Sequence, residues 1–148
     1  KWILSKLQTL NKFVDESLEG YKLTEPARAM VDFLDDLSNW YVRRSRDRFW
    51  AKETDQNKIN AYMTLYTALT TVIKLAAPMI PFMTEDIYRN LVCSIDPSAP
   101  ESIHLCDFPT VDEKPISLLL QPVVSVQMRS LKSLQSSRNW WTLIQDVN

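Results

Sequence analysis

The chain has 148 residues, 45% of them hydrophobic and 24% charged, which is the composition of one globular domain. Its 17 basic and 18 acidic residues give a formal net charge of -1, so any nucleic-acid site must come from a local concentration of charge. Gly20 is the only glycine, which excludes Gly-rich phosphate loops and disfavours a hairpin-rich all-β fold. We therefore predict an all-α helical bundle.

The first two helices are predicted from apolar residues at steps of three and four. Residues from Trp2 to Leu18 predict a helix that ends at Gly20, with this glycine in the C′ position. Thr24 is predicted to cap a second helix, which runs unbroken toward Trp50 for roughly 24 residues, or about 36 Å. One face of this helix is expected to carry Ala27, Met30, Phe33, Leu34, Leu37, Tyr41 and, near its end, Arg44.

The next two helices are predicted from the same periodicity, interrupted by proline. A third helix is expected from Ile59 to Ala76, where Pro78 and Pro81 stop it. Thr84 is then predicted to cap a short fourth helix, because two carboxylates follow it in the first turn.

After these helices we predict a boundary between two parts of the chain. The weak alternation in SIHLCDFP predicts a short extended segment near residues 102–106. We place a helical bundle in residues 1–112 and a C-terminal extension in residues 113–148, which is expected to be helical in part and broken at Pro122.

Residues with metal or catalytic chemistry are sparse. Cys93 and Cys106 lack CxxC spacing and His104 is the only histidine, so a metal site is not indicated. Asp35 and Asp36 are adjacent on the predicted helix and have no recognisable nucleophile or metal partner. No apolar run reaches the roughly 18 residues of a membrane span, and no signal peptide is visible. We expect a cytoplasmic chain with reduced cysteines, no cofactor, no membrane contact and no catalysis of its own.

The densest charged feature is NWYVRRSRDRFW, at residues 39–50. On one continuous helix Arg43 would neighbour Arg46, and Arg44 would neighbour Arg48, giving two basic ridges. Guanidinium groups bind phosphates and aromatic faces stack on unpaired bases, so the pattern is typical of an RNA-binding surface. The alternative is a structural or protein-interaction domain, in which these arginines pair with aspartates of the same helix and the aromatic residues belong to the core.

Four motifs occur in one order along residues 2–109: WILSKL, DDLSNWYVRRSRDRFW, APMIPFMTEDIYRNL and SIHLCDFP. Together they resemble the anticodon-binding domain of isoleucyl-tRNA synthetases, which belong to class I. The resemblance implies a helical bundle that binds the anticodon stem-loop of isoleucine tRNA and positions it for aminoacylation by a separate catalytic domain. ATP, and zinc where there is any, would be bound by other domains.

The resemblance also implies which residues contact tRNA. In the similar methionine enzyme, the residues at the positions of Lys6 and Trp50 contact the anticodon, so the resemblance implies the same role for these two residues. Trp2 stands where that enzyme has a polar contact residue. The complete set expected to bind tRNA is Lys6, Asn39, Arg43, Arg44, Arg46, Arg48 and Trp50. The implied partners are the tRNA and the catalytic and editing domains of the parent chain, which we expect to be monomeric. Residues 113–148 match the family pattern poorly.

Overall fold

The structure, a computed structural model, describes residues 2–51 and 55–111. Every regular element in these residues is helical, which confirms the all-α prediction. The C-terminal extension and its break at Pro122 lie outside the described residues. The elements are α1 (Trp2–Glu19), α2 (Thr24–Asp35), the π-helix η1 (Asp36–Val42), α3 (Arg46–Trp50), α4 (Gln56–Ala76), α5 (Pro81–Tyr88), the π-helix η2 (Arg89–Cys93) and the 3-10 helix η3 (Ile103–Leu105).

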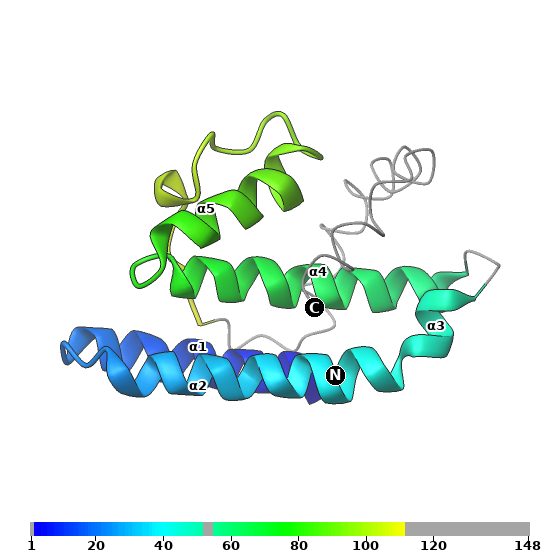
Figure 1. The fold of residues 1–148 in the computed structure, drawn as a ribbon, viewed down its shortest axis with the longest axis horizontal. Helices are drawn as coiled ribbons and strands as arrows, with labels where there is room; N and C mark the ends of the chain where they lie inside the picture. Colours follow the sequence, from blue (N-terminus) through cyan, green and yellow to red (C-terminus); the bar gives the residue numbers. More distant parts are fainter. Residues whose placement is uncertain (1, 52–54, 112–148) are drawn as a thin grey trace.

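The helices are arranged in three layers (Figure 1). Helices α1 and α2 lie antiparallel in one layer, α4 packs along them, and α5 lies on the other side of α4. Helix α3 connects the first layer to α4 at one end. The main core lies between the first layer and α4, and its buried residues are Ile3, Leu4, Leu7, Leu10, Val14, Met30, Phe33, Leu37, Ala68, Val72, Leu75 and Ala76.

The turn between α1 and α2 places a tyrosine where glycine was expected. Tyr21 has a φ of 55°, in the left-handed region, and Gly20 does not. The N–H of Tyr21 donates to the Leu18 carbonyl at 3.0 Å, and the N–H of Lys22 donates to the Ser17 carbonyl at 2.9 Å. This is the Schellman pattern with Tyr21 at C′, so the prediction of Gly20 at C′ was wrong by one residue.

We expect Tyr21→Gly to be more stable than Tyr21→Ala by about 1 kcal/mol, because glycine adopts positive φ without the steric cost that a Cβ imposes. Both variants remove the same phenol ring, which is 95% exposed and packs on little. Urea unfolding of the two variants measures the difference. Equal stability, or a more stable alanine variant, would contradict this account of the turn.

The second predicted helix is interrupted twice. In η1 the N–H of Arg43 donates to the carbonyl of Ser38, five residues back, and the helix then ends in a turn at Ser45 before α3 begins. The prediction of one unbroken helix was therefore wrong. A π-turn holds more residues than an α-turn. The residues that follow it therefore face different sides of the helix than they would in an unbroken α-helix. Arg44, expected on the inward face, is exposed and Ser45 is buried instead. Leu34, which lies in α2 before the π-turn, was also expected on the inward face and is 41% exposed.

The start of α4 and the start of α5 also differ from expectation. Helix α4 begins three residues earlier than predicted, because the Asp55 side chain accepts a hydrogen bond from the Lys58 N–H at 2.8 Å and caps it. Helix α5 begins at Pro81, which needs no N–H partner in the first turn. Thr84 is therefore not its cap: it is buried inside the helix and its hydroxyl donates to the Ile80 carbonyl at 3.0 Å.

The segment expected to be extended is instead a single 3-10 turn, η3, with extended residues only at its flanks, Ser102 and Cys106. The Glu85 carboxylate in α5 holds it in place. One oxygen accepts from the Ser102 hydroxyl at 2.8 Å and from the Ile103 N–H at 2.9 Å, and the other accepts from Arg89 at 2.8 Å. These bonds to a helical residue favour a turn over a strand.

The same hydrogen bonds, those from Ser102 and Ile103 first, lower the pKa of the Glu85 carboxyl. Its contribution to stability is therefore fully present above the ordinary glutamate pKa of about 4.3 and is lost as the pH falls through the lowered value. We expect Glu85→Gln to destabilise the chain at neutral pH and to have progressively less effect below about pH 4. Urea unfolding at several pH values measures this. Glu101→Gln is the control, because Glu101 is exposed and directly precedes Ser102 in the sequence. A Glu85→Gln effect on stability that is independent of pH would contradict the prediction.

Candidate nucleic-acid interface

The short helix α3 is fixed against α4 by an aromatic cluster. Phe49 is 5% exposed, and its ring centroid lies 6.3 Å from that of Tyr41 and 5.0 Å from that of Tyr62, both edge to face. The Tyr62 hydroxyl donates to the Phe49 carbonyl at 3.4 Å, and the Lys58 ammonium donates to the Ala51 carbonyl at 2.7 Å. The residues around Phe49 therefore have a defined position relative to the bundle.

Arg48 differs from the other three arginines of the predicted site. It is half-buried, and its guanidinium donates to the Asn57 carbonyl at the start of α4 at 3.1 Å. This contact connects α3 to α4, so Arg48 stabilises the position of the helix. The ridge expected from Arg44 and Arg48 therefore does not form, whereas Arg43 and Arg46 are both exposed, one on each side of the turn at Ser45.

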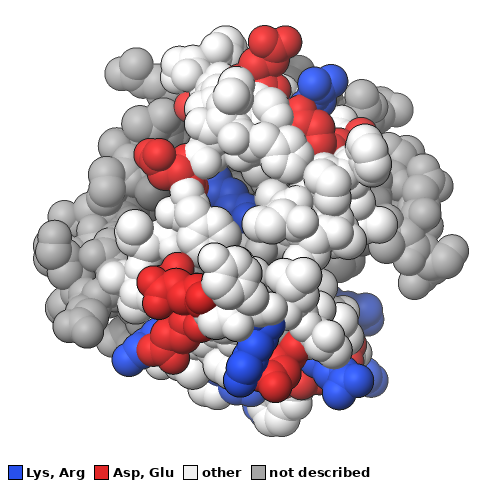
Figure 2. Space-filling view, turned by 90° about the vertical axis from the view of Figure 1, so that its left-hand side faces the viewer, with Lys and Arg blue, Asp and Glu red and all other residues white. Residues whose placement is uncertain are grey.

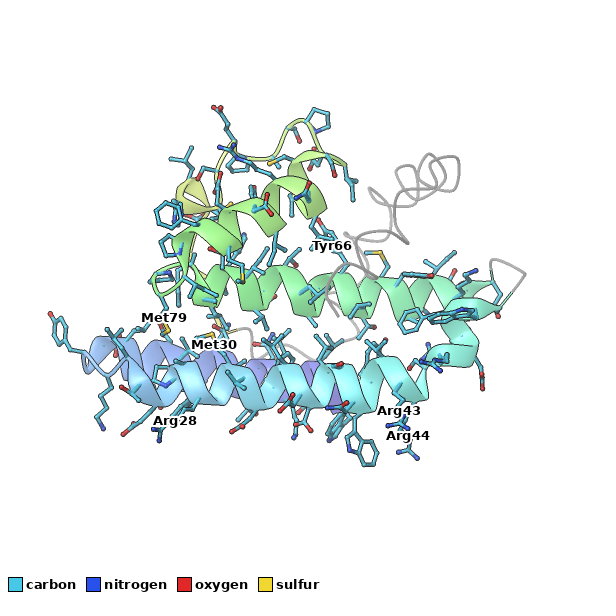
Figure 3. All side chains as sticks on the ribbon, viewed as in Figure 1. Arg28, Met30, Arg43, Arg44, Tyr66 and Met79 are labelled. Carbon is cyan, nitrogen blue, oxygen red and sulfur yellow. The ribbon has the colours of Figure 1, made fainter. Side chains whose placement is uncertain are left out.

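Arg43, Arg44 and Arg46 are exposed. Figure 3 shows the side chains of Arg43 and Arg44 extending from the end of the second helix, away from α4. Within residues 2–51 and 55–111, no ion pair joins any of these arginines to a carboxylate. The alternative in which they pair with aspartates of their own helix is therefore not what the described residues show. Asn39, also in the predicted set, is exposed on η1.

Three tryptophans at the end of the bundle that contains α3 each have a cation against the ring. In every pair the cation and the tryptophan are four residues apart in the sequence. Lys6 lies 4.9 Å from the ring centroid of Trp2, Arg44 lies 4.5 Å from that of Trp40, and Arg46 lies 5.7 Å from that of Trp50. The rings are 49%, 52% and 54% exposed, respectively. Such cation–π pairs leave aromatic surface beside positive charge.

Two of these pairs lie side by side on different helices. The rings of Trp2 in α1 and Trp40 in η1 have centroids 6.0 Å apart and are tilted by 49°. Lys6 also forms an ion pair with Asp36, at the start of η1. The sequence prediction left Trp40 out of the site, although its spacing of four residues from Arg44 was a usable signal.

At the other end of the molecule, acidic and basic side chains are interspersed (Figure 2). The part of the chain that the structure describes contains no group of three or more potential metal-binding His, Cys, Asp or Glu residues, and both cysteines there are free thiols. No helix among the described residues is long and apolar enough to cross a membrane.

Residues 1–140 match the family of anticodon-binding domains of tRNA ligases, and the chain belongs to this family. It is 52% identical to an isoleucine–tRNA ligase of Clostridium novyi and 50% identical to one of Clostridium tetani, in each case over 94% of the chain and 13% of the relative. An isoleucine–tRNA ligase of Methanosarcina mazei is 38% identical over 93% of the chain and 13% of the relative.

These relatives confirm the resemblance to the isoleucyl-tRNA synthetases, and they show that the chain spans only about an eighth of the length of such proteins. The family match continues to residue 140. The match therefore includes most of residues 113–148, for which the motifs indicated a poor fit to the family.

Proposed function

We propose that the chain binds the anticodon stem-loop of isoleucine tRNA as the anticodon-binding domain of an isoleucine–tRNA ligase. The observation that carries this proposal is the group of exposed cations and half-exposed indole rings at one end of the bundle, made up of Trp2, Lys6, Trp40, Arg43, Arg44, Arg46 and Trp50. We call this group the basic end. Family membership supports the assignment.

The chemistry of the basic end suits the loop of an RNA hairpin. Arg43 and Arg46 are exposed on either side of the Ser45 turn, and a guanidinium group binds phosphate oxygens through two parallel hydrogen bonds. Unpaired bases in a loop stack on aromatic side chains and hydrogen-bond through their free edges. Trp50, which follows Arg46 by one helical turn, supplies such a ring on α3. The fixed position of α3 against α4 would hold these groups in place before the RNA binds.

The remaining parts of the proposal concern the longer protein. Aminoacylation would be performed by a catalytic domain elsewhere in that protein, together with an editing domain, and this chain would contribute tRNA binding without a cofactor of its own. We expect a monomer in the cytoplasm. Positioning the anticodon on the basic end would fix the orientation in which the rest of the tRNA reaches the catalytic domain.

The test is a titration of labelled isoleucine tRNA anticodon stem-loop with the chain at about 50 and about 200 mM salt. We expect saturable binding that weakens strongly with salt, because phosphate contacts release counterions. The absence of saturable binding at the lower salt concentration would refute the proposed function. Binding with no salt dependence would also refute it, since the proposed contacts are mainly to phosphate.

A further inference from the structure

Trp2 and Trp40 are not among the residues that the sequence predicts to bind tRNA, although Trp2 stands where the methionine enzyme has a polar contact residue. Both rings are about half exposed, although burying an indole ring is normally favourable. They come from helices that run in opposite directions, and their centroids lie 6.0 Å apart. These two neighbouring tryptophans lie outside the core and provide an apolar surface about the size of one or two nucleobases, with the rings tilted by 49° to each other.

This surface has a cation at each ring. The Lys6 ammonium lies over the Trp2 ring, 4.9 Å from its centroid, and the Arg44 guanidinium lies over the Trp40 ring, 4.5 Å from its centroid. Alternating rings and cations match a single-stranded nucleic acid, in which bases alternate with phosphates. The π-helix η1 contributes Trp40, and the helix beyond it presents Arg44 to solvent. Segments of π-helix are rare and occur often at functional sites.

Asp36 reduces the charge available at this surface. Its carboxylate forms an ion pair with Lys6, and both side chains are partly exposed, at 30% and 46% respectively. Exposed ion pairs are weak, so a phosphate group competes with this carboxylate for the ammonium. Asp35, the residue before Asp36, is exposed, but Lys6 forms its ion pair with Asp36.

We propose that Trp2 and Trp40 form a stacking site for one unpaired RNA base, separate from Trp50, with Lys6 and Arg44 binding the phosphates on either side of it. Asp36 holds Lys6 beside the Trp2 ring until phosphate displaces the carboxylate. This inference rests on the proposed function and adds to it a second base-binding position and a residue that limits affinity.

The experiment measures the affinity of variants of the whole chain for the isoleucine tRNA anticodon stem-loop at about 50 mM salt. We expect Trp40→Ala to weaken binding roughly tenfold, since stacking on an aromatic ring contributes strongly for each base. Trp40→Phe keeps a ring and should stay within roughly threefold of the unmodified chain. Phe82→Ala is the matched control, because Phe82 is 90% exposed on α5, outside the basic end, and its removal should leave affinity unchanged.

A second pair of variants tests Asp36 without removing any ring. We expect Asp36→Asn to strengthen binding by roughly threefold or more at low salt and Asp35→Asn, the same charge change one residue away, to strengthen it clearly less. Equal effects would show that Asp36 acts only through its charge and would overturn its proposed role.

The stacking site is overturned if Trp40→Ala binds within twofold of the unmodified chain while loss of Arg43 and Arg46 weakens binding. That result would leave the proposed function intact and show that the tryptophan pair does not stack a base. If the unmodified chain does not bind the stem-loop, the proposed function and the stacking site both fail.

Discussion

Phe49→Ala is expected to destabilise the chain by about 3–4 kcal/mol, because a buried phenylalanine loses its transfer free energy and leaves a cavity. The ring is 5% exposed and packs edge to face on Tyr41 and Tyr62. Its loss also removes the main apolar contact that fixes α3. The free energy of unfolding, measured in urea, gives the size of the effect.

Phe82→Ala is the matched control, since it is the same substitution at a residue that is 90% exposed. It should change stability by less than about 0.5 kcal/mol. We also expect Phe49→Ala to weaken RNA binding at temperatures where the chain is still folded, because Arg46 and Trp50 lose their fixed position. A Phe49→Ala variant as stable as the control would show that α3 is held by its polar contacts alone.

The double variant Arg43→Ala plus Arg46→Ala is expected to weaken binding and to have the largest effect on its salt dependence. Both side chains are exposed, and each is proposed to neutralise one phosphate. Removing two such contacts should weaken binding roughly tenfold at low salt and reduce the slope of log affinity against log salt by roughly 1.5. Titrations at several salt concentrations give both quantities.

Arg28→Ala plus Lys12→Ala is a control with the same change in charge. Lys12 pairs with Glu16 in α1, and Figure 3 shows Arg28 far along the second helix from Arg43 and Arg44. This control should keep most of the affinity and most of the salt slope, because its charges lie outside the basic end. Similar losses in both double variants would indicate a diffuse charge effect instead of a defined site.

The periodic parts of the fold were predictable from sequence because a continuous apolar face needs only helical spacing. The predicted end of α4 at Ala76 is confirmed, and α1 extends to Glu19, one residue beyond the last apolar residue of its stripe. The errors lie where local hydrogen bonds decide a boundary. The Asp55 side chain caps α4, and backbone hydrogen bonds define the turn at Tyr21 and the π-turn before Arg43. Periodicity encodes none of these.

The sequence indicated the segment of the candidate site but not the surroundings of each residue. The structure exposes Arg43, Arg44 and Arg46 of the arginine run, and Arg48 is half-buried. The turn at Ser45 interrupts the helix, so Arg48 faces α4 instead of lying on the same side as Arg44. No glycine or proline marks this turn in the sequence. The contact between Trp2 and Trp40 joins residues 38 positions apart in sequence and needs the packing of two helices, so spacing along the chain could not show it.

The central claim is that the basic end binds unpaired bases as well as phosphates. The most direct measurement compares the affinity of the chain for the isoleucine tRNA anticodon stem-loop with its affinity for a blunt RNA duplex that has the same number of phosphates. Because a duplex keeps its bases stacked inside the helix, we expect the stem-loop to bind at least roughly tenfold more tightly at equal salt. Equal affinities would contradict the account, since they would reduce the basic end to a non-specific phosphate-binding surface.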